Sequence, residues 1–137
     1  MYQRLHIGLE EAQLGVEAAL AAAAERRLAI AVAVVDHRGD LVAFAAQDRV
    51  IQNSRGLCVR KAYAAAIGRR STSAFAALAS VPVELLLGPS ATSAQGGLAI
   101  LSEGVEVGGV GVSGADSPED DEMLAAVAID AMGLKAR

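Results

Sequence analysis

The sequence is poor in cysteine and in aromatic residues. Among 137 residues there is a single cysteine, Cys58, no tryptophan and an aromatic fraction of only 3%. One cysteine excludes an internal disulfide and fits a reducing compartment, so we expect a cytoplasmic protein. The hydrophobic fraction is nevertheless 53%. The core must therefore be built mainly from Ala, Val, Leu and Ile side chains.

Other features that the chain lacks argue against several functional classes. The formal net charge is -4 and the pI is about 5.1, which disfavours a nucleic-acid partner. No apolar run approaches the length of a membrane span and no signal-type segment opens the chain, so we expect no membrane partner. Only two histidines are present, His6 and His37, and they show no Cys/His spacing typical of a structural metal site.

Periodicity and turn chemistry predict one α+β domain, residues 1–137, with elements in the order α-β-β-α-α-β-β-α. Short turns between consecutive strands imply an antiparallel sheet built from two hairpins and flanked by helices. The expected helices are 9–27, 53–68, 71–79 and a last one capped by Asp116 or Ser117, and 83–87 is expected as a helical turn or a lid. The expected strands are 28–35, 41–46, 98–101 and 105–113.

The second strand of the later hairpin alternates valine with glycine, at Gly109 and Gly111 above all. Glycine inside a strand often marks a close approach by another backbone or by a ligand. Two interpretations follow. A helix packs tightly on the bare side of this strand, or a ligand lies against it.

Lys61 is the most informative charged residue, because it lies mid-helix on the same face as apolar neighbours. A lysine in that position must either extend its ammonium to water or meet an anion. The candidate anions are Asp36 in the first hairpin turn, Asp121 on the last helix, and an acidic group on a ligand. We expect Lys61 to anchor a ligand carboxylate.

Segments spread along the chain carry a family resemblance. The sequence resembles the GlcG/HbpS-like family of small haem-binding or haem-degrading domains, which also occurs at the C-terminus of PduO-type proteins. The matching segments are AVAVVDHRGDLVAF, KAYAAA, QGGLAIL and EVGGVGVSGADSPEDDEMLA. The resemblance covers roughly residues 9–132. It implies an antiparallel sheet flanked by helices and assembly into homo-oligomers.

Three functions remain open on this basis. The first is an accessory protein that binds a small ligand, haem or a related tetrapyrrole, with its propionates near Lys61 or a neighbouring arginine. The second is an enzyme acting on a small organic acid in a pocket lined by Lys61 and the Gly96–Gly97 loop. The third is a ligand-free assembly subunit. The candidate ligand-binding residues are Asp36, Lys61, Gln95, Gly96, Gly97 and Asp121.

The two histidines, His6 and His37, are the candidate ligands of a haem iron. His37 lies in the first hairpin turn, where side chains are ordinarily solvated. It is tied to the sheet by a short turn, whereas His6 precedes the first helix and lies near a terminus. His37 is therefore the better candidate for the haem iron.

Overall fold

The computed structural model describes all residues from Met1 to Arg137 as an α+β fold with one antiparallel sheet. The strand order is β2-β1-β4-β3-β5, and every neighbouring pair runs antiparallel. The helices are α1 Leu9–Glu25, α2 Asn53–Gly68, α3 Thr72–Leu78, α4 Val83–Leu87 and α5 Pro118–Ala131. The strands are β1 Ala31–Asp36, β2 Leu41–Ala46, β3 Gly97–Ser102, β4 Val105–Ser113 and β5 Lys135–Ala136.

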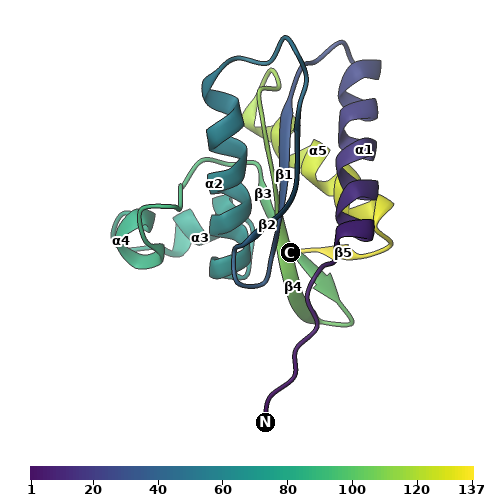
Figure 1. The fold of residues 1–137 in the computed structure, drawn as a ribbon. Helices are drawn as coiled ribbons and strands as arrows, with labels where there is room; N and C mark the ends of the chain where they lie inside the picture. The colour runs from purple at the N-terminus through teal and green to yellow at the C-terminus, as the bar shows by residue number, and fades with distance from the viewer.

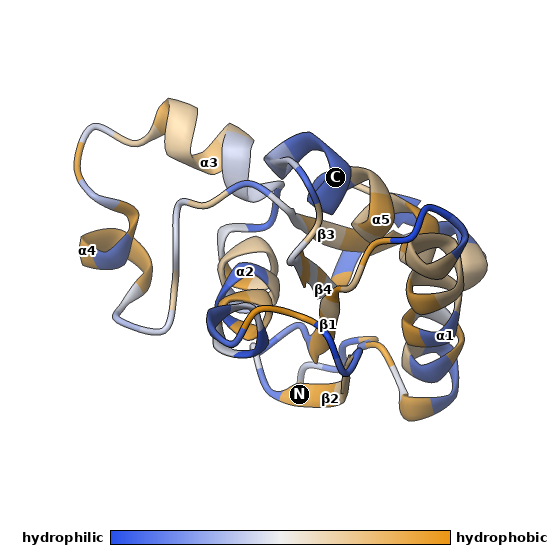
Figure 2. Ribbon diagram, turned by 90° about the horizontal axis from the view of Figure 1, so that it is seen from above, coloured by the Kyte–Doolittle hydropathy of each residue, from blue (hydrophilic) through white to orange (hydrophobic).

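The sheet separates two helical layers (Figure 1). Helices α1 and α5 cover one face, and α2 lies against the other. Viewed from above, α3 and α4 extend outwards from the α2 side, away from the sheet (Figure 2). Strand β1 lies in the middle of these layers and all six of its residues are buried, as expected for a strand that is apolar on both faces.

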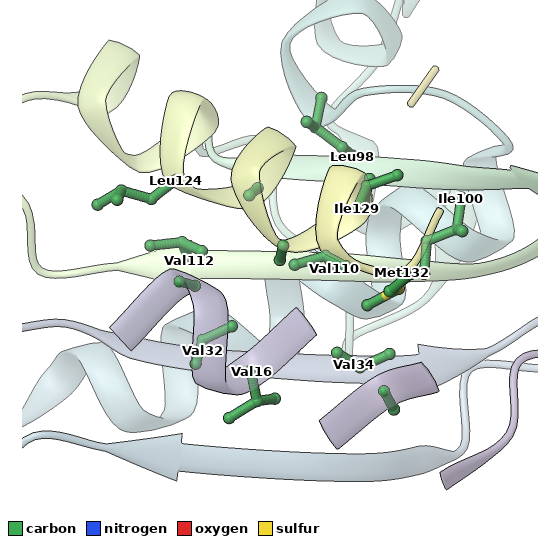
Figure 3. Close-up of a cluster of buried hydrophobic side chains, with 14 of the residues drawn as sticks. Val16, Val32, Val34, Leu98, Ile100, Val110, Val112, Leu124, Ile129 and Met132 are labelled. Atoms are coloured by element: carbon green, nitrogen blue, oxygen red, sulfur yellow. The ribbon is translucent and has the colours of Figure 1, made fainter. Parts of the chain in front are cut away.

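The larger core lies between the sheet and the α1/α5 layer (Figure 3). Val32 and Val34 of β1 and Val110 and Val112 of β4 point towards Leu124 and Ile129 of α5 and towards Met132 just after it, while Val16 comes from α1. These branched aliphatic side chains supply most of the core in place of the missing aromatics. The smaller core on the α2 side contains alanine, valine and Cys58.

The small residues of the α2-side core let the helix lie almost directly on the glycine strand. A Cβ atom at Gly111 would overlap the Cys58 carbonyl oxygen, and one at Gly109 would overlap the Ala62 carbonyl oxygen. Both clashes are with helix backbone, which cannot rotate away. Of the two interpretations of the glycines, close helix packing is therefore the one that the structure shows at these positions.

The predicted order of elements is confirmed, with differences at the ends. Helix α1 ends at Glu25 and β1 begins at Ala31, so residues 28–30 connect the two elements and do not open the strand. The segment 83–87 is a helix, and the short edge strand β5 is an addition to the predicted elements. No helix in the chain combines the length and the apolar character needed to cross a bilayer.

Candidate functional site

An ion pair between α2 and α5 lies at one end of the sheet. The Lys61 side chain is 2% exposed, and its Nζ donates to Asp121 Oδ2 at 2.9 Å and to the Val112 carbonyl oxygen at 2.8 Å. The other carboxylate oxygen, Asp121 Oδ1, accepts the backbone N–H of Ala115 at 2.9 Å. Asp121 is therefore the anion that Lys61 meets.

Glycines beside the ion pair provide the space that it needs. Gly96 has φ of +124°, and a Cβ atom there would lie 2.9 Å from Lys61 Nζ and 2.7 Å from the Val112 carbonyl oxygen. A Cβ atom at Gly97 would overlap the Lys61 carbonyl oxygen. The double glycine thus allows the segment before β3 to pass closely over α2.

A cleft of about 440 Å³ opens over this ion pair. Its base includes the side chains of Ser54, Lys61, Ser113 and Asp121, all of them buried. Its other lining residues, which come from the start of α2, the segment before β3 and the start of α5, are Ile51, Asn53, Leu57, Ala94, Gln95, Gly114, Ala115, Asp116, Ser117 and Pro118. The lining contains no histidine and no aromatic ring.

The structure brings five of the six predicted ligand-binding residues together. Lys61, Gln95 and Asp121 line the cleft, and Gly96 and Gly97 lie directly behind it. Gln95 also donates from Nε2 to Glu122 Oε2 at 3.1 Å, which ties the loop to α5.

Asp36 is placed elsewhere, at the far end of β1. It pairs in register with Gly108, whereas the other end of β1, at Ala31, pairs with Ser113. Its Oδ1 accepts the backbone N–H groups of Arg38 and Asp40 at 2.8 and 3.1 Å. Burial is the largest single influence on the pKa of Asp36 and raises it, but these hydrogen bonds and the Arg38 side chain together hold the pKa below its ordinary value. Asp36 therefore stabilises the β1–β2 turn.

The two histidines lie side by side at this far end. The ring centroids of His6 and His37 are 5.4 Å apart, with the planes tilted by 50°. In Figure 1 the β1–β2 turn is at the lower end of the sheet, near the N-terminal segment, and α2 begins at the upper end. The segment before α1 is fixed here by the Ile7 N–H, which donates to the Val107 carbonyl oxygen at 2.9 Å.

The surroundings of His37 favour its neutral form. Desolvation lowers its pKa from the ordinary 6.5, and the positive charge of Arg4 acts in the same direction, while Asp36 opposes them. Its Nδ1 is buried and has no hydrogen-bond partner within the protein. A neutral imidazole with an unused nitrogen is the form that binds a metal.

Cys58 takes no part in either group of residues. The thiol is fully buried in the α2-side core, and burial raises its pKa to about 12. A thiol with so little thiolate at neutral pH is neither a nucleophile nor a metal ligand.

Two features of these regions are absent from the sequence-based predictions. The first is the proximity of His6 to His37, which depends on the path of residues before α1. The second is the contact in which Ser113 Oγ donates to Ser54 Oγ at 3.3 Å, both side chains being buried. From sequence Ser54 is a candidate only for a helix cap, and no spacing rule links it to a serine on β4.

Comparisons with known proteins agree with the fold. The family model described as "Haem degrading protein HbpS-like" matches residues 7–130. The solved structure of Klebsiella pneumoniae protein ORFY is 25% identical, with TM-score 0.90 over 97% of this chain and 94% of that one. A double mutant of Streptomyces reticuli HbpS is 30% identical, with TM-score 0.87 over 95% and 89%.

A third solved structure, a PduOC:heme complex, shares the fold at 23% identity, with TM-score 0.88 over 97% of this chain and 99% of that one. A search of curated proteins finds no match.

Proposed function

Since the chain belongs to the HbpS-like family, whose model is described as haem-degrading, we propose that it binds haem or a related tetrapyrrole as a small-ligand-binding accessory protein. The site is the histidine end of the sheet, formed by the β1–β2 turn and the segment before α1. The observation that carries the proposal is the pair His6 and His37, with centroids 5.4 Å apart. The fold of the PduOC:heme complex is consistent with it.

The chemistry of these residues fits haem. Neutral imidazole is a common ligand of haem iron, and the His37 side chain is only partly buried, so part of its ring can be reached from solvent. Haem, when bound, would supply an iron centre that can take an imidazole nitrogen as a ligand. His37 is the first candidate to hold it, in line with its position in a short turn tied to the sheet. His6 is the second candidate.

Arginines near the histidines are suited to the propionates. Arg38 follows His37 directly; its Nη2 lies 3.5 Å from Asp36 Oδ2 and 3.4 Å from Asp40 Oδ2, but its side chain is 65% exposed, so these pairs leave donors open to a ligand. Arg4 donates from Nη2 to the Glu106 carbonyl oxygen at 2.7 Å, while its buried Nε has no partner. Guanidinium groups bind carboxylates in a bidentate manner. These two residues therefore replace Lys61 as candidate propionate partners.

Lys61 is too distant for that role within one chain. Its ammonium bonds Val112, which pairs with Val32 on β1, whereas His37 follows the last residue of β1. Five residue steps along the chain, from Val32 to His37, separate the two levels, roughly 16 Å at about 3.3 Å per residue. Within one chain, a haem held by His37 would therefore lie closer to Arg38 and Arg4 than to Lys61.

Titration with hemin tests the proposal. We expect a shifted Soret band with the wild-type chain, and at least a tenfold weaker affinity for His37→Ala, which is about 1.4 kcal/mol. His6→Ala should have a smaller effect. Gln95→Ala, which alters only the cleft at the other end, is the matched control and should bind hemin normally.

Two results would count against it. If His6→Ala abolishes the shift and His37→Ala does not, the order of the two ligands is reversed. If the wild-type chain gives no spectral shift, the haem-binding function is wrong, and an enzyme at the cleft or a ligand-free subunit must be considered instead.

A further inference from the structure

We propose that the cleft between α2 and the start of α5 is a second ligand site, separate from the histidine end. We infer that it takes a small neutral molecule carrying carbonyl or hydroxyl oxygens. Its volume of about 440 Å³ is within the usual range for small-molecule pockets. The class of ligand follows from two features of the cleft. Unused hydrogen-bond donors at its base call for acceptor oxygens, and the charges of its lining call for a neutral molecule.

One hydrogen on each of two buried donors at the base of the cleft, Lys61 Nζ and Ser54 Oγ, has no acceptor in the protein. The Lys61 ammonium has three N–H groups, of which Val112 and Asp121 accept two. The Ser54 hydroxyl accepts from Ser113 at 3.3 Å, and its own hydrogen has no acceptor among the bonds of the structure. Ser54 and Lys61 are seven residues apart on α2, which places both on the same face of the helix.

Unused donors that are this deeply buried are costly unless something accepts from them. Ser54 is 1% exposed and Lys61 is 2% exposed, and both border the cleft. A ligand oxygen in the cleft satisfies one or both. The class of ligand is therefore one with acceptor oxygens close to its surface.

The charges of the lining select against an acid. The charged lining residues are Lys61, Asp116 and Asp121, one cation against two carboxylates. The cation is already paired with Asp121 at 2.9 Å. A carboxylate ligand would be repelled by the exposed Asp116, and no lining cation is free to offset that repulsion. To pair with Lys61, it would have to displace Asp121. This replaces the expectation from sequence that Lys61 anchors a ligand carboxylate.

The apolar part of the lining is suited to a short carbon skeleton. Ile51 and Leu57 border the cleft beside Asn53 and Gln95. Small-molecule sites usually combine such apolar contacts with a few polar groups that fix orientation. A hydroxy-amide or a polyol has both the carbon skeleton and the acceptor oxygens.

The test compares each neutral probe with its own acid. Amide resonances of the isotopically labelled full chain are followed by NMR during titration with lactamide and lactate, and with gluconamide and gluconate, at matched ionic strength. We expect saturable shifts at Gly114 and Ala115 with at least one of the two amides. That amide should bind at least tenfold more tightly than its acid.

Cleft-filling variants locate the binding. Ala94→Trp places a large ring on a partly exposed part of the lining and should remove the shifts. Ala24→Trp adds the same ring at an exposed position of α1 and should leave them unchanged. Neither variant should alter the hemin titration, so failure at this site is distinguishable from failure at the histidine end.

Three results would overturn the proposal. Equal or tighter binding of the acids would contradict the charge argument. Saturable binding that survives Ala94→Trp would place the ligand outside the cleft. The absence of saturable shifts with both amides would show that the cleft takes no ligand of this class.

Discussion

Lys61 and Asp121 connect the two helical layers through a buried ion pair, with 2.9 Å between Nζ and Oδ2. Lys61 belongs to α2 on one face of the sheet and Asp121 to α5 on the other. The lysine reaches across at the level of Val112, whose carbonyl oxygen accepts a second hydrogen bond. The pair therefore fixes how α2 and α5 are placed relative to each other and shapes the base of the cleft.

Removing one partner of this pair should destabilise the fold. Lys61→Met leaves the Asp121 carboxylate buried without its cation, and breaking a buried pair in this way costs about 3–5 kcal/mol. We expect the double variant Lys61→Met/Asp121→Leu to recover much of that loss, because it removes both charges. Urea denaturation measures each variant. A loss below about 1 kcal/mol for the single variant would mean that the pair behaves as an exposed one.

The glycine strand gives a second prediction about stability. A side chain at Gly111 would meet the backbone of α2, because its Cβ atom would overlap the Cys58 carbonyl oxygen and lie 2.5 Å from the Ala62 nitrogen. Gly111→Val should therefore reduce the free energy of unfolding by at least the roughly 1–3 kcal/mol typical of overpacking. Thermal and urea denaturation of the purified variant measure this loss.

Gly56 provides the matched control for that variant. It lies inside α2, and a Cβ atom there would have no atom within 4 Å. Gly56→Ala should raise stability by about 0.5–1 kcal/mol, because alanine loses less backbone entropy in a helix. If Gly111→Val melts like the wild-type chain, α2 does not pack on the strand as described.

His37 should make stability depend on pH. Its pKa is lowered in the folded chain, first by desolvation and then by Arg4. The unfolded chain consequently binds more protons just below the ordinary value of 6.5, so stability should fall as the pH drops through that value. The decrease should level off below the folded pKa. Asp36, whose pKa is also lowered, acts in a more acidic range, below its ordinary 3.8.

Urea denaturation at about pH 7.5 and about pH 5.5 separates these contributions, since histidine is the only side chain with an ordinary pKa between them. The wild-type chain should be less stable at the lower pH. His37→Gln should show a smaller difference, because its amide does not titrate. An unchanged difference in His37→Gln would assign the effect to another group.

Local patterns in the sequence are sufficient to predict most of the fold. Helix α2 and strands β2 and β4 have the predicted bounds, because Asn53, Gly68 and the hairpin turns are strong local signals. Strand β5 escapes prediction because two residues at the chain end carry no periodicity. Its position depends on pairing of Leu101 with Lys135, a contact that only the tertiary fold creates.

The composition of the site can be predicted from sequence, but its arrangement cannot. A lysine on an apolar helix face has to meet an anion, and Asp121 is among the candidates. Helical spacing cannot choose between Asp36 and Asp121, because the choice depends on which end of β1 faces α5. For the same reason, the sequence could not choose between Lys61 and a neighbouring arginine as the propionate partner, since only the fold shows that Lys61 and His37 lie at opposite ends of the sheet.

Self-association is the last prediction, and it concerns the part of the chain that extends away from the sheet. Three leucines on α3 and α4 are largely exposed: Leu78 is 70% exposed, Leu85 76% and Leu86 53%. Figure 2 shows α4 mostly in the hydrophobic colour, away from the main body. Monomeric proteins rarely leave such apolar clusters uncovered.

We therefore expect a homo-oligomer at micromolar concentration, with this surface buried between copies. Light scattering should give a mass well above the 13.9 kDa of one chain. Leu85→Asp should lower that mass, because a carboxylate buried between copies has no cation to meet. Ala21→Asp, which adds the same carboxylate at an exposed position of α1, is the control and should leave the mass unchanged. A mass of one chain across dilution would show that the leucines are exposed for another reason.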